Sequence, residues 1–164
     1  MTMVALPVID PVYVEWKKFL QTGNPYKCKA RQQVAESWGR CYQRGIDPYN
    51  DTICHRLDDL NLHKVLKEKE VLIEIAKPFL AKLHGLFQRA GYVVALADEN
   101  GCILEMLCDE DMRQQPVARF FYPGVSWREE AAGTNAIGTA LMLGEALQVS
   151  GAEHYCRNYH AFTC

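Results

Sequence analysis

The stretch Tyr92-Val-Val-Ala-Leu-Ala-Asp-Glu-Asn-Gly-Cys-Ile-Leu-Glu-Met-Leu107 decides the fold. Its first six residues form a short apolar run that favours β structure, and residues 98–101 form a polar segment that ends in glycine. A second apolar run follows over residues 102–107. Two such runs joined by a short polar turn are typical of an antiparallel hairpin. The sequence therefore predicts two neighbouring strands with their turn at 98–101.

The segment before the hairpin, residues 62–87, predicts one long amphipathic helix. Apolar side chains recur there at alternating intervals of four and three residues, and only Lys69 interrupts them. Pro78 has no amide N–H to donate within a helix, so a kink is expected near residues 74–77.

The apolar stripe of this helix is wide enough for two neighbours. Leu72, Ile75 and Phe79 extend it, so the helix is expected to cover a sheet with one face and another helix with the adjacent face. The four-three spacing also favours pairing with a second copy of the chain, and packing inside a monomeric bundle is the alternative. The residues predicted for a homodimer helix are Leu62, Leu66, Ile73, Leu80, Leu83 and Phe87.

Further short elements are predicted on both sides of the hairpin. Residues 31–42 have apolar side chains at helical spacing, and a short helix is expected to start at Trp127. Residues 133–143 form a run of small and apolar residues that predicts a helix, residues 146–150 predict a strand, and residues 153–160 predict a helical turn. Helices that flank a small antiparallel sheet make an α+β fold.

Composition excludes several classes of protein. The 164 residues are 49% hydrophobic and 23% charged, with a formal net charge of -2, as expected of one ordinary globular domain. No Lys/Arg run is long enough to neutralise a row of phosphates, so direct nucleic-acid binding by this segment is not expected. No apolar stretch approaches the ~20 residues that span a bilayer, and no secretory signal begins the chain. A cytoplasmic protein without membrane contact is expected.

The seven cysteines include no C-x-x-C pair. His154, Cys156, His160 and Cys164 have the pattern H-x-C-x3-H-x3-C, which on a helix would place the last three on one face. They are an alternative site for a transition metal; core packing is the competing interpretation. Cys102 and Cys108 flank a predicted strand, where a thiolate near a cation could do redox chemistry; buried, inert thiols are the favoured interpretation.

Six motifs, in register from about residue 30 to the end of the chain, resemble one bacterial family. They are Arg31-x-x-Val34-x-x-Ser37-Trp38-x-Arg40-Cys41-x-x-x-Gly45-Ile-Asp-Pro48, Val94-x-Leu96-x-Asp98-x-x-Gly101-x-Ile-Leu104, Pro123-Gly124-x-x-Trp127, Gly133-Thr-Asn-Ala-Ile-Gly-Thr-Ala140, Gln148-Val-x-Gly151-Ala-Glu-His154 and Thr163-Cys164. Their order is similar to the N-terminal region of sigma-54-dependent activators, typified by regulators of acetoin, glycerol and diol catabolism.

The resemblance implies a non-enzymatic GAF sensor domain, an antiparallel sheet backed by helices, in which a homodimer is common. Because GAF-type folds also include a reductase that works through cysteines, a GAF-type thiol oxidoreductase is an alternative. The resemblance also implies an N-terminal helical segment over 1–60 and the sensor domain over 61–164. The AAA+ and helix-turn-helix modules of such regulators lie outside this chain, and so do the strands that complete the GAF sheet after Thr163-Cys164. This fold is therefore expected to be truncated at its C-terminal end.

A small organic metabolite is the expected partner, with no cofactor. A pocket for a hydroxy-ketone or diol needs an apolar wall with a few fixed donors and acceptors. We expect it between the sheet and residues 122–139. The candidate ligand-binding residues are Tyr92, Tyr122, Trp127, Glu130, Thr134, Asn135 and His154.

Overall fold

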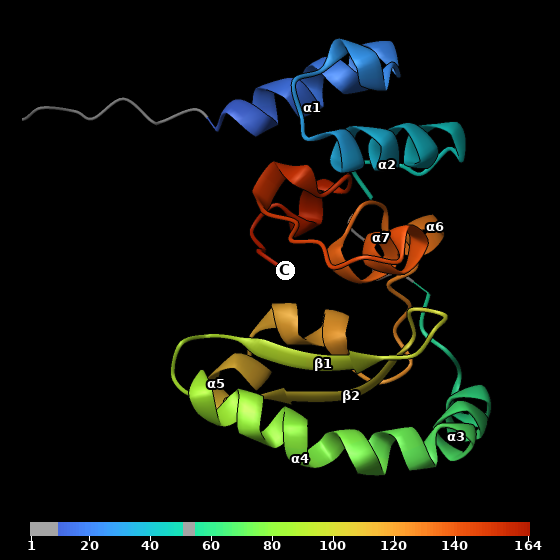
Figure 1. The fold of residues 1–164 in the computed structure, drawn as a ribbon, viewed down its shortest axis with the longest axis vertical. Helices are drawn as coiled ribbons and strands as arrows, with labels where there is room; N and C mark the ends of the chain where they lie inside the picture. The colour runs from blue at the N-terminus through green and yellow to red at the C-terminus, as the bar shows by residue number, and fades with distance from the viewer. Residues whose placement is uncertain (1–9, 51–54) are drawn as a thin grey trace, which may run out of the picture. The chain divides into compact units, whose positions relative to one another are not determined.

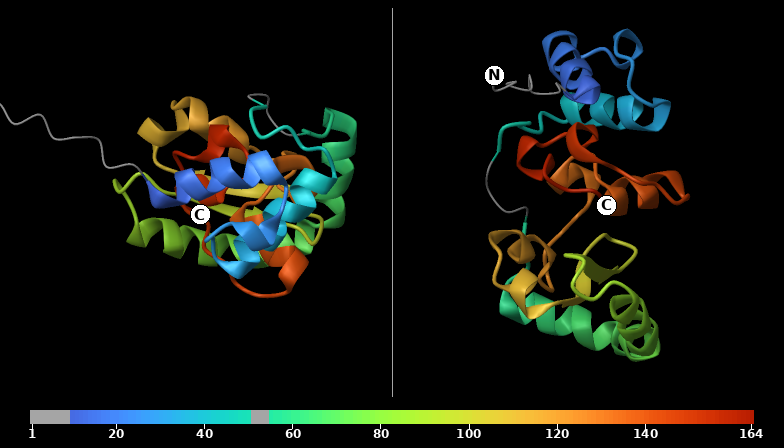
Figure 2. Two further views of the ribbon diagram at one scale, coloured as in Figure 1. Left: turned by 90° about the horizontal axis from the view of Figure 1, so that it is seen from above. Right: turned by 90° about the vertical axis from the view of Figure 1, so that its left-hand side faces the viewer.

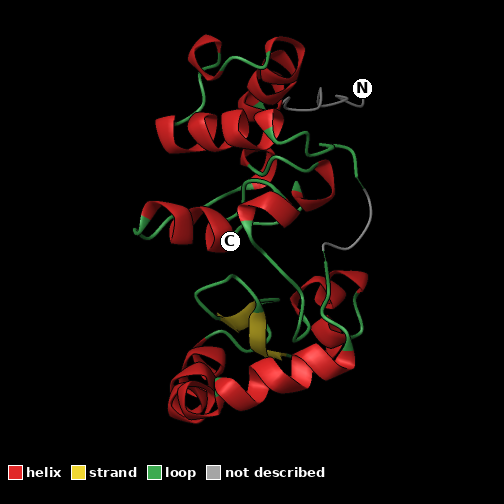
Figure 3. Cartoon of the chain, turned by 90° about the vertical axis from the view of Figure 1, so that its right-hand side faces the viewer, coloured by secondary structure: helices red, strands yellow, loops and turns green. Residues whose placement is uncertain are grey.

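The computed structural model describes residues 10–50 and 55–164. The chain forms two compact units, residues 1–51 with 133–164 and residues 52–132. Figure 1 shows the elements of both units, and Figure 3 shows that, in the described part of the chain, only β1 and β2 are strands. Helices with one antiparallel hairpin confirm the α+β class. The predicted boundary between residues 60 and 61 stays a prediction.

The first unit begins with α1 (Pro11–Thr22), a helix within the expected N-terminal helical segment for which the sequence analysis gave no separate bounds. The Asp10 carboxylate accepts a hydrogen bond from the Val12 amide at 2.9 Å, and Pro11 occupies the first turn, where no amide donor is needed. Gly23 ends the helix at φ 62°, and a Cβ there would lie 2.5 Å from the Tyr42 ring. Glycine is therefore required at this turn.

The other elements of the first unit are short helices. The predicted helix at 31–42 is confirmed as α2 (Gln32–Gln43), and the small-residue helix is α7 (Ala136–Leu143). The predicted strand at 146–150 is wrong: only an isolated bridge from Ser150 to Thr163 forms there. The 3-10 turns are η1 (Pro25–Lys27), η3 (Gly151–Glu153) and η4 (Arg157–Tyr159), and the last two replace the predicted helical turn at 153–160.

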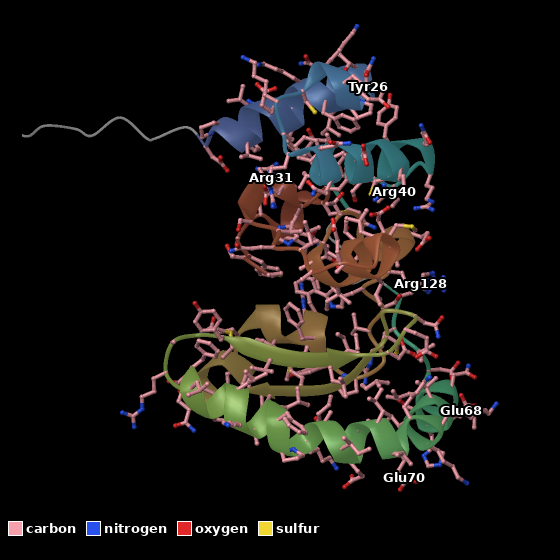
Figure 4. All side chains as sticks on the ribbon, in the orientation of Figure 1. Tyr26, Arg31, Arg40, Glu68, Glu70 and Arg128 are labelled. Carbon is pink, nitrogen blue, oxygen red and sulfur yellow. The ribbon has the colours of Figure 1, made fainter. Side chains whose placement is uncertain are left out.

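Tryptophans join the N-terminal helices to the end of the chain. The indole N–H of Trp16 donates to the Tyr155 carbonyl at 2.9 Å, and that of Trp38 donates to the Glu153 carbonyl at 2.8 Å. Arg31, labelled in Figure 4, pairs with the Glu153 carboxylate at 2.7 Å. Both tryptophans are fully buried, so the aromatic core of this unit depends on contacts between residues more than 100 positions apart.

The second unit contains the predicted hairpin, β1 (Val93–Ala97) and β2 (Ile103–Cys108). The strands are antiparallel, with Val93 opposite Cys108 and an irregularity between Leu96 and Ala97. The Asp98 carboxylate accepts hydrogen bonds from the amides of Asn100 and Cys102, which fixes the turn. The remaining short elements are α5 (Glu110–Arg113), η2 (Pro116–Phe121) and α6 (Glu129–Ala132), the last lying two residues beyond the expected start at Trp127.

The long helix before the hairpin is two helices, α3 (Asp59–Glu68) and α4 (Glu70–Leu86), so the prediction of one helix is wrong. The interruption falls at Lys69, the residue that broke the apolar spacing, whereas α4 continues through Pro78. As Figures 1 and 2 show, α4 lies along one face of the hairpin, which confirms that one helix face covers the sheet.

The apolar stripe of α4 is only partly covered. Ile73 and Leu80 are buried, whereas Ile75 and Phe79 are 63% and 64% exposed. Two of the residues predicted for a homodimer helix are therefore used inside this unit, and the adjacent face is left exposed to solvent.

Candidate functional site

The predicted ligand residues belong to both compact units, so the predicted pocket between the sheet and residues 122–139 stays a prediction. In the second unit Trp127 is buried, donates its indole N–H to the Phe120 carbonyl at 2.7 Å and stacks on Phe121. Glu130 lies 3.7 Å from Arg128, and Tyr92 is half-exposed against the Phe87 ring. Tyr122 is partly buried.

In the first unit Thr134 and Asn135 are fully buried and hold the backbone together. The Thr134 and Ser37 hydroxyls lie 2.7 Å apart, and this hydrogen bond links the residues just before α7 to α2. The Asn135 side chain accepts from the Gly138 amide and donates to the Gly133 carbonyl, each at 2.7 Å. Asn135 is thus the N-cap of α7. These bonds give both residues a structural role.

His154 is fully buried. Its Nδ1 lies 3.0 Å from the Gly151 carbonyl, so the proton of the neutral ring sits on Nδ1. Its Nε2 is buried and has no hydrogen-bond partner within the described residues. Burial lowers the pKa of His154 to about 4, which keeps the imidazole neutral at physiological pH.

The alternative metal site is not assembled. Among residues 10–50 and 55–164, no group of three or more His, Cys, Asp or Glu side chains is placed to hold a metal ion. His160 Nε2 lies 3.1 Å from the His154 carbonyl, Cys156 Sγ faces the Asp47 carbonyl at 3.9 Å, and Cys164 is exposed. The predicted spacing required an α-helix, and this segment forms 3-10 turns instead.

The buried thiols do not have the environment of a reactive cysteine. Burial raises the pKa of both Cys102 and Cys108 above the ordinary thiol value. A thiolate, the reactive form, is disfavoured at both positions.

The first unit contains a cavity of about 510 Å³ that the sequence analysis did not predict. It opens to solvent and combines aromatic, aliphatic and cationic side chains. We call it the tyrosine cavity; its lining residues are Lys17, Leu20, Gln21, Tyr42, Gly45, Ile46, Pro48, Tyr49 and Tyr155. Its size lies within the range of about 300 to 1,000 Å³ that is usual for small-molecule pockets.

The walls of the tyrosine cavity are fixed by hydrogen bonds. The Trp16–Tyr155 bond ties α1 to the C-terminal wall, and the Arg157 amide donates to the Pro48 carbonyl at 2.8 Å. The loop after α2 turns at Gly45, φ 71°, and the Asp47 carboxylate accepts from the Tyr49 amide at 2.9 Å. The cavity is therefore preformed, which reduces the entropy lost on binding.

A sequence signal for part of the tyrosine cavity existed. Asp10-Pro11 has the N-cap and first-turn chemistry of a helix start, and Trp16 and Phe19 lie three residues apart on one face. The wall formed by Tyr155 has no local signal, because it meets α1 across 139 positions.

Comparison with known proteins identifies relatives over most of the chain. It is 32% identical over 149 residues to the acetoin dehydrogenase operon transcriptional activator AcoR of Bacillus subtilis, covering 91% of this chain and 25% of that protein. It is 33% identical over 134 residues to the acetoin catabolism regulatory protein of Cupriavidus necator, covering 80% and 20%. The chain thus spans about a fifth to a quarter of the length of these relatives. Both relatives are regulators by name, as the sequence analysis expected for this chain's family.

A solved structure supports the fold. The crystal structure of the E. coli DhaR(N)-DhaL complex contains a chain that matches with a TM-score of 0.75 at 20% identity, covering 81% of this chain and 45% of that one.

Among the described residues, none of the helices has both the length and the apolar character that a membrane span requires. Residues 14–164 match the family of the MimR N-terminal domain, and the chain belongs to that family.

Proposed function

We propose that this chain is the small-molecule sensing domain of a bacterial transcriptional activator of a catabolic operon. The observation that carries the proposal is the preformed tyrosine cavity in a chain related to activators of the acetoin dehydrogenase and propane 2-monooxygenase operons. Effector binding would be passed to AAA+ and helix-turn-helix modules of a sigma-54-dependent regulator, in the cytoplasm.

The proposal has a direct test in thermal unfolding. A ligand that binds only the folded state stabilises it by about 2.7 kcal/mol at a concentration 100 times its Kd. Acetoin, butanediols, glycerol and dihydroxyacetone are the first effectors to compare, with divalent metals as the alternative. We expect a concentration-dependent rise of the melting temperature with a small organic molecule. A rise with metal alone would instead favour the His/Cys alternative.

We further propose that the sensor acts as a homodimer through the exposed face of α4. This face presents Val71, Ile75, Phe79 and Leu86, which are 63–71% exposed. Exposed apolar patches of this kind mark protein interfaces. Ile75→Glu should convert a dimer to a monomer in sedimentation equilibrium, whereas Lys77→Glu, an exposed change on the same helix, should not. A monomer at all concentrations would contradict the homodimer proposal.

A further inference from the structure

The tyrosine cavity has a composition that selects one kind of ligand. We infer that it binds a small planar carboxylate, such as an aromatic acid, with the carboxylate on Lys17 and the ring against the tyrosines. The inference rests on the proposed function and names the ligand class of the same site. It departs from the neutral ketones and diols that the resemblance suggests.

Charge is the first reason for the inference. Lys17 is the one charged residue among the described residues that line the cavity, and no carboxylate in the described ranges pairs with it. Its ammonium lies 4.8 Å from the centre of the Tyr13 ring, so its partner is an aromatic face. An anionic ligand would give this ammonium a charge-assisted hydrogen bond, about twice as strong as a neutral one.

Shape is the second reason. Tyr42, Tyr49 and Tyr155 come from three separate segments and line one cavity together with the aliphatic side chains of Leu20 and Ile46. Tyr42 and Tyr49 stay 46% and 53% exposed, although each also contacts a buried aromatic ring of α1. Aromatic faces that are held in place but not covered favour a flat, unsaturated ligand over a saturated one.

The third reason is a hydrogen-bond donor in the cavity wall. Tyr155 lines the cavity and is 1% exposed. Burial raises the pKa of this phenol well above its ordinary value, so the group stays protonated and can only be neutral. Because Tyr155 lines the cavity, its hydroxyl could donate a hydrogen bond to an oxygen of the ligand.

Trp16 reports on the cavity without lining it. Its ring lies 5.6 Å from that of Tyr49, and its indole N–H donates to the Tyr155 carbonyl. The indole N–H resonance of Trp16 should therefore shift in an NMR titration when the cavity is occupied.

The experiment compares three probes of similar size by this resonance. Benzoate is planar and anionic, benzyl alcohol is planar and neutral, and cyclohexanecarboxylate is anionic and not flat. We expect saturable binding of benzoate that is at least tenfold tighter than that of either other probe. Equal binding of all three would overturn the inference.

Variants locate the bound carboxylate. Lys17→Gln should weaken benzoate binding about tenfold, and Tyr155→Phe should weaken it about threefold, because each removes one donor. Lys18→Gln is the matched control, since Lys18 is on the same helix, pairs with Glu15 and does not line the cavity. Unchanged affinity in Lys17→Gln would contradict the assignment. Lys17 is exposed, so its variant should keep the wild-type melting temperature.

The two proposals fail in different ways. If acetoin or a diol shifts the Trp16 resonance and benzoate does not, the sensing function stands and the carboxylate inference is wrong. If no small molecule shifts this resonance or raises the melting temperature, both are wrong.

Discussion

The two compact units bury their apolar side chains in opposite ways. The first unit closes around tryptophans whose indole N–H groups donate to carbonyls near the end of the chain, and its buried polar side chains are largely paired. The second unit packs a local hairpin on α4 and leaves most of that helix's large apolar side chains exposed to solvent. The contrast suggests that the first unit is built to be rigid and the second to present a surface.

The largest effect that tests this contrast is expected from Trp16→Ala. The substitution removes a fully buried ring and its hydrogen bond to Tyr155, so it should lower the free energy of unfolding by about 3 to 5 kcal/mol. Chemical denaturation followed by circular dichroism measures the change. Tyr26→Ala is the control, because Tyr26 is 89% exposed and its loss should be nearly neutral. If both variants changed the free energy of unfolding equally, the first unit would not depend on its buried tryptophans, and the contrast between the two units would be wrong.

Two isoleucines on α4 test the second unit. Ile73→Ala should lower the free energy of unfolding by about 3 kcal/mol, because Ile73 is buried against the hairpin. Ile75→Ala, the same change two residues along the helix, should alter it by less than about 0.5 kcal/mol in the monomer. Denaturation at low and high protein concentration measures both effects. A cost for Ile75→Ala that grows with concentration would place this face in an interface.

The buried histidine should give the first unit a pH dependence. The pKa of His154 is about 4 in the folded chain and about 6.5 unfolded, so between these values only the unfolded state binds the proton. Stability should therefore fall as the pH falls from about 6.5 toward 4, with a slope of up to about 1.4 kcal/mol per pH unit.

The histidine prediction is checked by denaturation of wild type and His154→Phe across this pH range. Burial also lowers the pKa of His160, so part of the slope should remain in the variant. An identical slope in both proteins would contradict the assignment.

The smallest effect is expected at the N-cap of α7. Asn135→Ala removes both the oxygen that accepts from the Gly138 amide and the amide group that donates to the Gly133 carbonyl, and it should lower the free energy of unfolding by about 1 to 2 kcal/mol. Asn135→Ser retains a capping oxygen and should recover part of this loss. If both variants equal wild type in thermal denaturation, the cap does not contribute to stability.

The elements that were predicted correctly from the sequence depend mostly on local patterns of residues. The hairpin turn at Asp98–Gly101 and helix α2 depend on residues close in sequence, and both were predicted. The break at Lys69 was visible as an interruption, but its consequence, two helices, was not foreseen. The tyrosine cavity as a whole could not be predicted, because Lys17, Tyr49 and Tyr155 line it together only through long-range packing.

The 139-residue separation between Trp16 and Tyr155 has a consequence for synthesis of the protein. As the chain leaves the ribosome, residues 52–132 are complete before the last part of the first unit has been translated. The segment between the two halves of the first unit can therefore fold while Trp16 and Trp38 still lack their contacts with Tyr155 and Glu153. Slow translation after residue 132 would lengthen this interval, and the nascent chain would then depend most on chaperones.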